Sequence, residues 1–140
     1  MNFTDYLTQK LPAVEAEIMR GLPAATLPTG ATLAATATTS PATAATSSER
    51  TRADLNTYLY QPLAHFSAGG GKRVRPVLCC LGAEAVGGSA EAALPVACAI
   101  EDFQSAALIH DDIADKSELR RGEKCLYKTL GTGLAINVGD

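Results

Sequence analysis

Apolar residues recur at helical spacing through most of this chain. Near the start they fall mostly three or four positions apart, which is the spacing of one apolar face of a helix. These positions are Phe3, Tyr6, Leu7, Leu11, Val14 and Ile18. The pattern predicts a helix over residues 2–20 that ends near Gly21 and Pro23. No segment shows sustained alternation with period two, so the chain is predicted to be all-α.

Three further helices are bounded by local start and stop signals. Ser47 or Ser48 can cap a helix that runs through Phe66, bends or restarts at Pro62 and ends at the glycines 69–71. The next is predicted from Pro76 to about Val86, followed by a pair of glycines. The third begins after Ser89 and runs to about Asp115. Its apolar residues occupy nearly every face of the helix, as expected of a central helix.

Residues 22–48 differ from the rest of the chain in composition. This stretch of 27 residues contains nine Ala, eight Thr and three Pro, with few large apolar side chains. Such a sequence buries too little surface to offset the entropy of ordering and is too poor in Leu, Ile, Val and Phe to span a membrane. We therefore expect an amphipathic helix at residues 1–21, a flexible linker at 22–48, and a helical domain at 49–140. Residues 132–140 begin another apolar helix that stops within its pattern, so we expect this domain to be the front part of a longer protein.

Charge and cysteine content narrow the class of protein. The chain has 12 Lys and Arg against 15 Asp and Glu, a formal charge of −3, which argues against a basic nucleic-acid binder. Its four cysteines form no CxxC pair and favour a reducing, cytoplasmic setting. Charged residues within the first helix argue against a secretory signal.

The strongest chemical signal lies at the end of the most apolar helix. Asp111 and Asp115 are one helical turn apart on the same face, and Asp112 is adjacent. Three carboxylates at the mouth of an apolar cavity would hold Mg²⁺, which keeps several waters and bridges to substrate phosphates. Considered alone, such a sequence of aspartates is more often a solvent-exposed acidic helix end than a metal site. His110 precedes the aspartates and is expected to pack or hydrogen-bond beside them, whereas His65 is expected to be a partly buried polar residue.

Two basic clusters accompany the acidic one. In the first, three glycines at 69–71 allow the backbone to approach a ligand, and Lys72, Arg73 and Arg75 follow within four residues. In the second, Arg120 and Arg121 follow Asp115 and could fork onto phosphate oxygens. A solvated basic turn and ordinary ion pairs with the aspartates are the alternatives. Taken together, the three clusters suit the binding of two diphosphates, one through Mg²⁺ and one directly.

The motifs GGGKRVRP and DDIAD-x4-RRG, in this order, resemble the front half of the trans-type polyprenyl diphosphate synthases. These all-α enzymes lengthen allylic diphosphates with isopentenyl diphosphate. The resemblance covers residues 55–140 and implies a Mg²⁺-dependent prenyl transferase that forms a homodimer when complete. It implies binding of isopentenyl diphosphate by Lys72, Arg73, Arg75, Gln104 and Arg121. It further implies that Mg²⁺ is held by Asp111, Asp112 and Asp115, with Arg120 on the allylic diphosphate.

The resemblance also implies where product length is set. In the family, bulky aromatics four and five positions before the first aspartate close the pocket at farnesyl. Here those positions are Ala107 and Ala106, and the next large side chain is Phe103. We therefore expect a geranylgeranyl or longer product.

Two departures and three alternatives remain at this stage. The insertion at residues 22–48 is longer than the family's usual connection, and the family's second aspartate-rich motif lies in a half that this sequence lacks, so we expect the 140 residues to be inactive alone. A class I terpene cyclase would use the aspartates but has no use for the glycine-rich basic turn. A non-catalytic, diphosphate-binding subunit and a plain helical interaction domain are the others.

Overall fold

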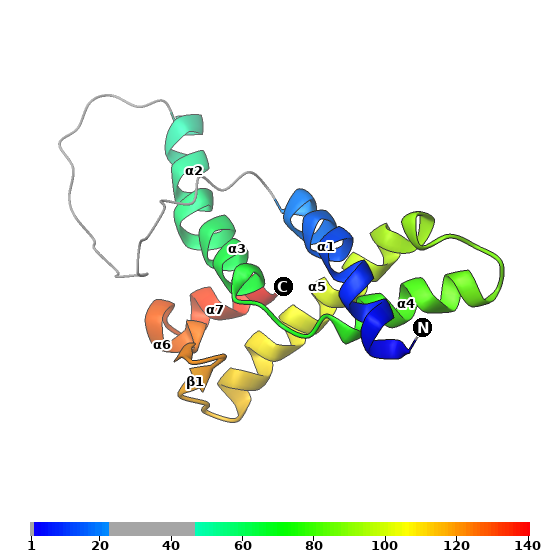
Figure 1. Cartoon of the computed structure of the whole chain (residues 1–140). Coiled ribbons are helices and arrows are strands. Elements are labelled where there is room, and N and C mark those ends of the chain that lie inside the picture. The colour runs from blue at the N-terminus through cyan, green and yellow to red at the C-terminus, as the bar shows by residue number, and fades with distance from the viewer. Residues whose placement is uncertain (1, 23–46) are drawn as a thin grey trace.

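The structure, a computed structural model, describes residues 2–22 and 47–140 and is predominantly helical within them (Figure 1). This confirms the all-α prediction. The helices are α1 (Phe3–Gly21), α2 (Ser47–Leu55), α3 (Gln61–Ala68), α4 (Val74–Ala85), α5 (Ala90–Ala114), α6 (Leu126–Leu130) and α7 (Thr132–Gly139), with a π-helical turn, η1 (Asn56–Tyr60), between α2 and α3. The two strands are β1 (Leu119–Arg120) and β2 (Glu123–Lys124).

Helix α1 begins at a capping box. The Asn2 side chain accepts a hydrogen bond of 2.9 Å from the Asp5 amide, and the Asp5 carboxylate accepts one from the Asn2 amide. These bonds satisfy amides that have no partner within the helix. The apolar face buries Tyr6, Val14 and Ile18, as the spacing predicts.

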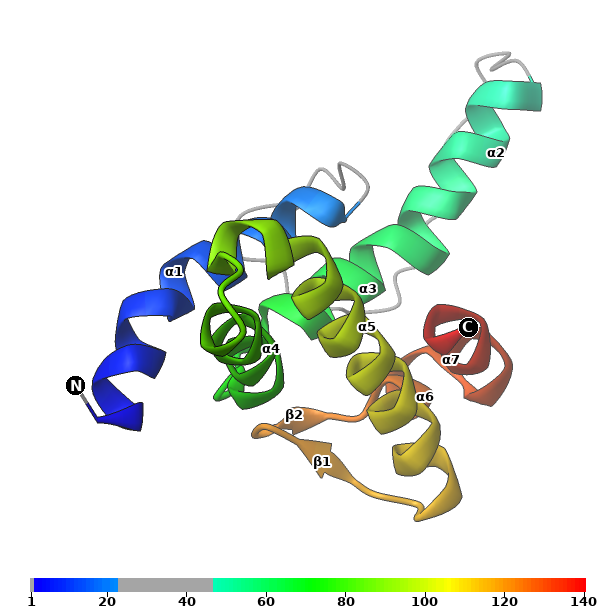
Figure 2. The same ribbon diagram turned by 90° about the vertical axis from the view of Figure 1, so that its right-hand side faces the viewer.

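The second predicted helix is a continuous rod with a π-helical turn inside it (Figure 2). Pro62 has no amide hydrogen and its ring crowds the preceding turn. The chain widens before that point, and the Gln61 amide donates to the Asn56 carbonyl five residues back. The interruption expected at Pro62 is therefore located at Asn56–Tyr60. The rod begins at Ser47, two residues inside the stretch predicted as linker; residues 23–46 of that stretch lie outside the described residues.

Helices α4 and α5 pack against each other, and α1 packs against both (Figure 2). The Ser89 hydroxyl accepts from the Ala92 amide at 3.2 Å and starts α5 where predicted. Helix α4 starts at Val74, two residues before the predicted Pro76. The three helices share one apolar cluster, whose buried members are Tyr6, Val14, Ile18, Val77, Cys80, Ala90, Ala97 and Cys98.

A second apolar cluster lies at the other end of α5. Its buried members come from α3, α5, α6 and α7, and they are Phe66, Ile109, Leu126, Ala135 and Val138. Because α5 contributes to one cluster along its first half and to the other along its second half, it is the central helix of the described chain. It is also the one described helix long and apolar enough to cross a membrane by length and composition. Contacts with α1, α4 and α7 bury 28% of its most apolar window, and the rest of that window is not buried in the described chain.

Helix α7 approaches α5 through small residues. Ala135 and Gly139, four positions apart, are both buried. A Cβ atom at Gly139 would lie 2.5 Å from Nε2 of His110, closer than such atoms can approach. Nε2 of His110 also lies 3.3 Å from the Ile136 carbonyl, so the imidazole contacts α7.

The short hairpin between α5 and α6 was not predicted. Leu119 pairs with Lys124 and Arg120 with Glu123 in antiparallel register. The two loop residues, Arg121 and Gly122, both have positive φ, at 55° and 86°. That is the requirement of a tight two-residue hairpin turn, whose twist matches that of the strands.

Candidate functional site

The three aspartates at the end of α5 have different surroundings. The Asp111 side chain is 57% exposed, and Asp115, the C-cap of the helix, is exposed as well. The Asp112 side chain is only 2% exposed. Both of its oxygens accept from Nε of Arg120, at 3.0 and 3.2 Å, and these hydrogen bonds raise the pKa of Arg120 above its ordinary value. The site thus has two open carboxylates and one that is engaged by an arginine.

The donor set fits a divalent cation. Asp111 and Asp115 present hard oxygen ligands one turn apart on an exposed face, and Mg²⁺ is usually held by one or two carboxylates with the remaining positions filled by water and phosphate. The oxygens of Asp112 face Arg120, and its part in holding the metal stays a prediction. Among residues 2–22 and 47–140, no three His, Cys, Asp or Glu side chains converge on one metal position.

The glycine-rich turn before α4 exposes two of its three cations. Lys72 and Arg75 are exposed, as a role in binding requires. Arg73 is the exception and corrects the prediction, since its side chain is only 4% exposed. Its guanidinium donates to Glu101 at 2.8 Å and to the Ser67 carbonyl. A group enclosed in this way cannot reach a diphosphate on the surface.

The second basic cluster lies directly against the first. Nη1 of Arg121 donates to the Phe66 carbonyl at 3.2 Å, and the guanidinium lies 5.4 Å from the centre of the Phe66 ring. A Cβ atom at Gly71 would be 3.3 Å from Nη2 of Arg121 and 3.6 Å from Nη1 of Arg73. Both guanidinium groups therefore lie directly beside the backbone of Gly71.

Burial and a like charge act on Arg121. Desolvation first, and then the neighbouring Arg73, lower the pKa of its guanidinium from the ordinary value, while Glu101 acts in the opposite sense. The guanidinium remains charged at neutral pH because arginine titrates far above it. An anion arriving beside Arg121 would relieve this unfavourable environment.

A cavity of about 50 Å³ lies between the end of α3 and the hairpin. Arg120, Arg121, Lys124 and His65 are among the residues that line it. His65 lies 2.6 Å from the Glu123 carboxylate at its rim and is half-buried, as expected. The cavity joins the two arginines of the hairpin to the glycine-rich turn through Gly69.

The remaining predicted residues lie on α5. Gln104 is half-buried, and it precedes Asp111 by seven residues, about two turns, so the two lie nearly in line along the helix. Phe103 is 78% exposed and Ala107 is exposed, whereas Ala106 is half-buried. The three residues expected to limit product length are thus on or beside the uncovered side of α5.

Sequence reasoning missed Glu101. It precedes Asp112 by eleven residues, about three turns, and both lie on the buried side of α5. Each holds one arginine, Arg73 from the glycine-rich turn and Arg120 from the hairpin. The only available signal was a carboxylate within an apolar run of the helix.

With this geometry in place, similarity to known proteins identifies the family. A family model described as polyprenyl synthetase matches residues 56–140, which includes all three charged clusters. The chain belongs to the polyprenyl synthetase family. This polyprenyl synthetase sequence carries α1 and α2 outside the matched segment.

Several relatives are named as synthases of a C20 diphosphate. The chain is 42% identical over 84 residues to the large subunit 1 of the heterodimeric geranylgeranyl pyrophosphate synthase of Arabidopsis thaliana, covering 59% of this chain and 23% of that protein. It is 44% identical over 82 residues to the geranylgeranyl pyrophosphate synthase of Geoglobus acetivorans, covering 59% and 26%.

Solved structures agree. The crystal structure of a geranylgeranyl pyrophosphate synthase superposes on the whole chain with a TM-score of 0.64 and 28% identity, and 33% of that protein is covered. The Geoglobus acetivorans synthetase gives a TM-score of 0.58 and 43% identity over 60% of this chain and 28% of its own. The chain thus spans between about a quarter and a third of the length of these relatives.

Proposed function

We propose that the complete protein is a Mg²⁺-dependent prenyl transferase that joins isopentenyl diphosphate to an allylic diphosphate and releases a geranylgeranyl or longer diphosphate. The observation that carries this proposal is the separation of charge in the site. Open carboxylates, Asp111 and Asp115, end α5, while exposed cations lie on the glycine-rich turn and the hairpin. One site could hold a diphosphate through a metal ion and the other could hold one directly.

Each group has a distinct part in the proposed reaction. Asp111 and Asp115 hold Mg²⁺, which when bound neutralises the charge that develops on the leaving diphosphate of the allylic substrate. Asp112 orients Arg120, which lies 3.7 Å from Asp111 and so can reach the same diphosphate. Lys72, Arg75, Gln104 and Arg121 hold isopentenyl diphosphate so that its double bond meets the allylic carbon. The rate then comes from positioning and the exclusion of water.

Phe103 on the exposed side of α5 supports the product length that we propose. The alanines at 106 and 107 leave the helix surface open between this aromatic ring and Asp111. We also propose that the 140 residues alone bind diphosphate without turnover, since two open carboxylates supply too few ligands for a cluster that activates the leaving group. The names of the relatives as synthases do not favour a non-catalytic subunit.

Two further parts of the proposal concern the setting of the complete protein. A reducing, cytoplasmic compartment is consistent with the four free cysteines, of which Cys80, Cys98 and Cys125 are buried. Homodimerisation rests on the resemblance to the family and is checked by light scattering of the complete protein.

The test separates the two binding sites. In the complete protein, Asp111→Ala should lower the rate of prenyl transfer by orders of magnitude at saturating substrate, because the charge on the leaving group is no longer neutralised. Lys72→Ala and Arg121→Ala should raise KM for isopentenyl diphosphate by about tenfold or more and change KM for the allylic substrate less, because each removes a charge-assisted contact. Full activity of Asp111→Ala, or equal effects of Lys72→Ala on both substrates, would refute the proposal. Arg52→Ala, which removes an exposed cation of α2 outside the clusters, is the control.

A further inference from the structure

The turn that carries Lys72 and Arg75 is held in place by the buried side chain of Arg73. Arg73, between them, has φ = 47° and ψ = 31°, a left-handed conformation that is unfavourable for residues other than glycine. Its carbonyl accepts the first helical bond of α4 from the Val77 amide at 3.2 Å. A strained residue in this position persists where its surroundings fix it, and the fixing contacts here are made by its own guanidinium.

Glu101 is the charged partner in those contacts. The Arg73 and Glu101 side chains are 4% and 8% exposed and meet at 2.8 Å. Nε of Arg73 is buried without a hydrogen-bond partner among the described residues, so the ion pair with Glu101 and the bond to the Ser67 carbonyl fix the group. Two buried charges brought together in this way hold each other's position strongly, because separating them would leave a buried charge without its partner.

The Glu101 carboxylate also offsets the repulsion between the Arg73 and Arg121 guanidinium groups. Arg73 and Arg121 both border the space above Gly71, at 3.6 and 3.3 Å from where its Cβ would be. Like charges this close repel in a partly buried site. Glu101 contributes the compensating negative charge from α5, so that the turn and the hairpin can lie together.

We infer that Glu101 is a positioning residue for the isopentenyl diphosphate site: through Arg73 it fixes the glycine-rich turn so that Lys72, Arg75 and Arg121 converge on one diphosphate. This inference rests on the proposed function and deepens it. Glu101 touches no substrate and acts only through Arg73. It is distinct from Asp112, which holds Arg120 beside the allylic site.

The experiment measures two ligands on the same variants of the complete protein. Isothermal titration with isopentenyl diphosphate reports the basic site, and titration with geranyl diphosphate in the presence of Mg²⁺ reports the acidic one. Glu101→Gln keeps the shape of the side chain and removes its charge. It should lower the affinity for isopentenyl diphosphate by about tenfold or more, which is the range for residues that support the groups contacting a ligand. Geranyl diphosphate binding should be unchanged. Glu101→Asp, which keeps the charge, should recover part of the lost affinity.

Two controls separate positioning from stability. Glu91→Gln makes the same substitution at an exposed position of the same helix and should leave both affinities unchanged. The double variant Arg73→Met with Glu101→Leu replaces the buried pair by apolar side chains, which proteins commonly tolerate. We expect it to fold, which circular dichroism checks, and to bind isopentenyl diphosphate more weakly than the unchanged protein.

The outcomes distinguish this inference from the function on which it rests. If the unchanged complete protein binds isopentenyl diphosphate and Glu101→Gln or the folded double variant binds it equally well, the positioning role is wrong while the proposed function stands. Equal losses for both ligands would show a general structural role and also overturn it. If the unchanged complete protein does not bind isopentenyl diphosphate at all, the proposed function fails and the inference with it.

Discussion

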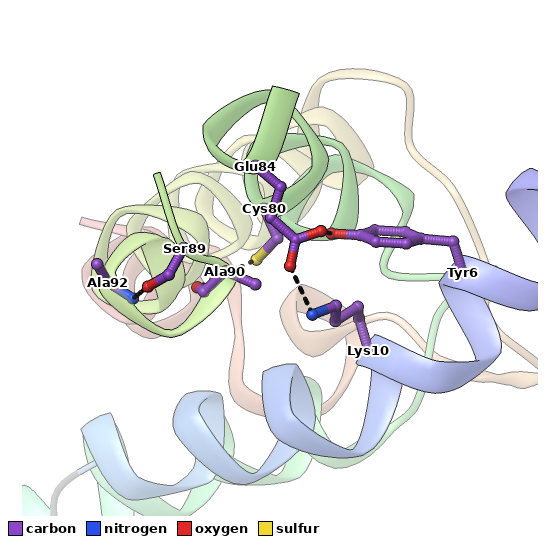
Figure 3. A network of polar contacts seen from close by, with 7 residues as sticks. All are labelled: Tyr6, Lys10, Cys80, Glu84, Ser89, Ala90 and Ala92. Atoms are coloured by element: carbon purple, nitrogen blue, oxygen red, sulfur yellow. Dashed lines mark hydrogen bonds and ion pairs between the residues drawn. The ribbon is translucent and has the colours of Figure 1, made fainter. Parts of the chain in front are cut away.

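The phenol of Tyr6 donates a hydrogen bond of 2.8 Å to the carboxylate of Glu84, 78 positions further along the chain (Figure 3). The other oxygen of that carboxylate accepts from the Lys10 ammonium group at 2.7 Å. One side chain near the end of α4 therefore binds two successive turns of α1. The contact ties a helix outside the segment matched by the family model to the α4 and α5 pair.

Removing the phenol oxygen should loosen this attachment. Tyr6→Phe keeps the buried ring and deletes the donor, so the free energy of unfolding should fall by about 0.5–1.5 kcal/mol. Urea unfolding of the 140-residue chain measures it. Tyr58→Phe is the matched control, since Tyr58 is 48% exposed and should cost almost nothing. Equal effects of the two substitutions would contradict the attachment.

The same contact predicts a dependence of stability on pH. Hydrogen bonds from Lys10 first, and then from Tyr6, lower the pKa of Glu84 below its ordinary value of 4.5. A lowered pKa in the folded state stabilises the protein above the unfolded value and loses that effect as pH falls through the folded value. The stability difference between the unchanged chain and Glu84→Gln should therefore be constant above pH 4.5 and shrink below it.

Urea midpoints from pH 7 down to about pH 3 test this window. Glu15→Gln, at an exposed position of α1, serves as the control. A difference for Glu84→Gln that grows on acidification would reverse the sign and refute the explanation.

The two adjacent aspartates should differ in their effect on stability. Asp112→Asn leaves Arg120 without its buried partner and should cost about 3 kcal/mol in the free energy of unfolding. Asp111→Asn removes an exposed charge and should change stability by less than about 0.5 kcal/mol. Chemical denaturation of the two variants checks this contrast. Comparable losses would mean that Asp112 is not held as the structure shows.

Product length gives a test on the complete protein. Ala106→Phe places an aromatic ring about one turn closer to Asp111 than Phe103, so the products should be shorter than those of the unchanged enzyme. Chromatography of the released prenyl chains measures this. Farnesyl diphosphate as the main product of the unchanged enzyme, or no shortening in the variant, would refute the role of these positions. Ala99→Phe, an exposed position further from Asp111 on the same helix, is the control.

Local signals predicted the helices well because helix ends are determined by neighbouring residues. Ser89 caps α5 through a bond to an amide three positions away, and this can be read directly from the chain. The hairpin was missed because two strands of two residues are too short to show a periodicity. The π-helical turn was missed for a related reason. Pro62 indicates that the helix is interrupted, but not at which residues the hydrogen-bonding pattern changes.

The sequence predicted which charged residues cluster at the candidate site, but not which of their side chains are buried. Spacing placed Lys72, Arg73 and Arg75 in one basic cluster, but it could not show that the middle residue turns inward. That direction depends on Glu101, 28 positions away, and on the left-handed backbone at Arg73. Likewise, the string of aspartates does not show that Asp112 faces a hairpin which the sequence did not predict. Long-range ion pairs decide these orientations, and they follow from the fold.

Gly139 sets a limit on how this sequence can vary. A library of all side chains at that position should return glycine almost alone, because even alanine would collide with the His110 ring. Either the ring or α7 would have to shift to relieve this contact. A methyl group on α7 would therefore disturb the side chain that directly precedes the aspartates of α5. Positions of this kind make an acidic motif vulnerable to substitutions that no inspection of the motif itself would identify.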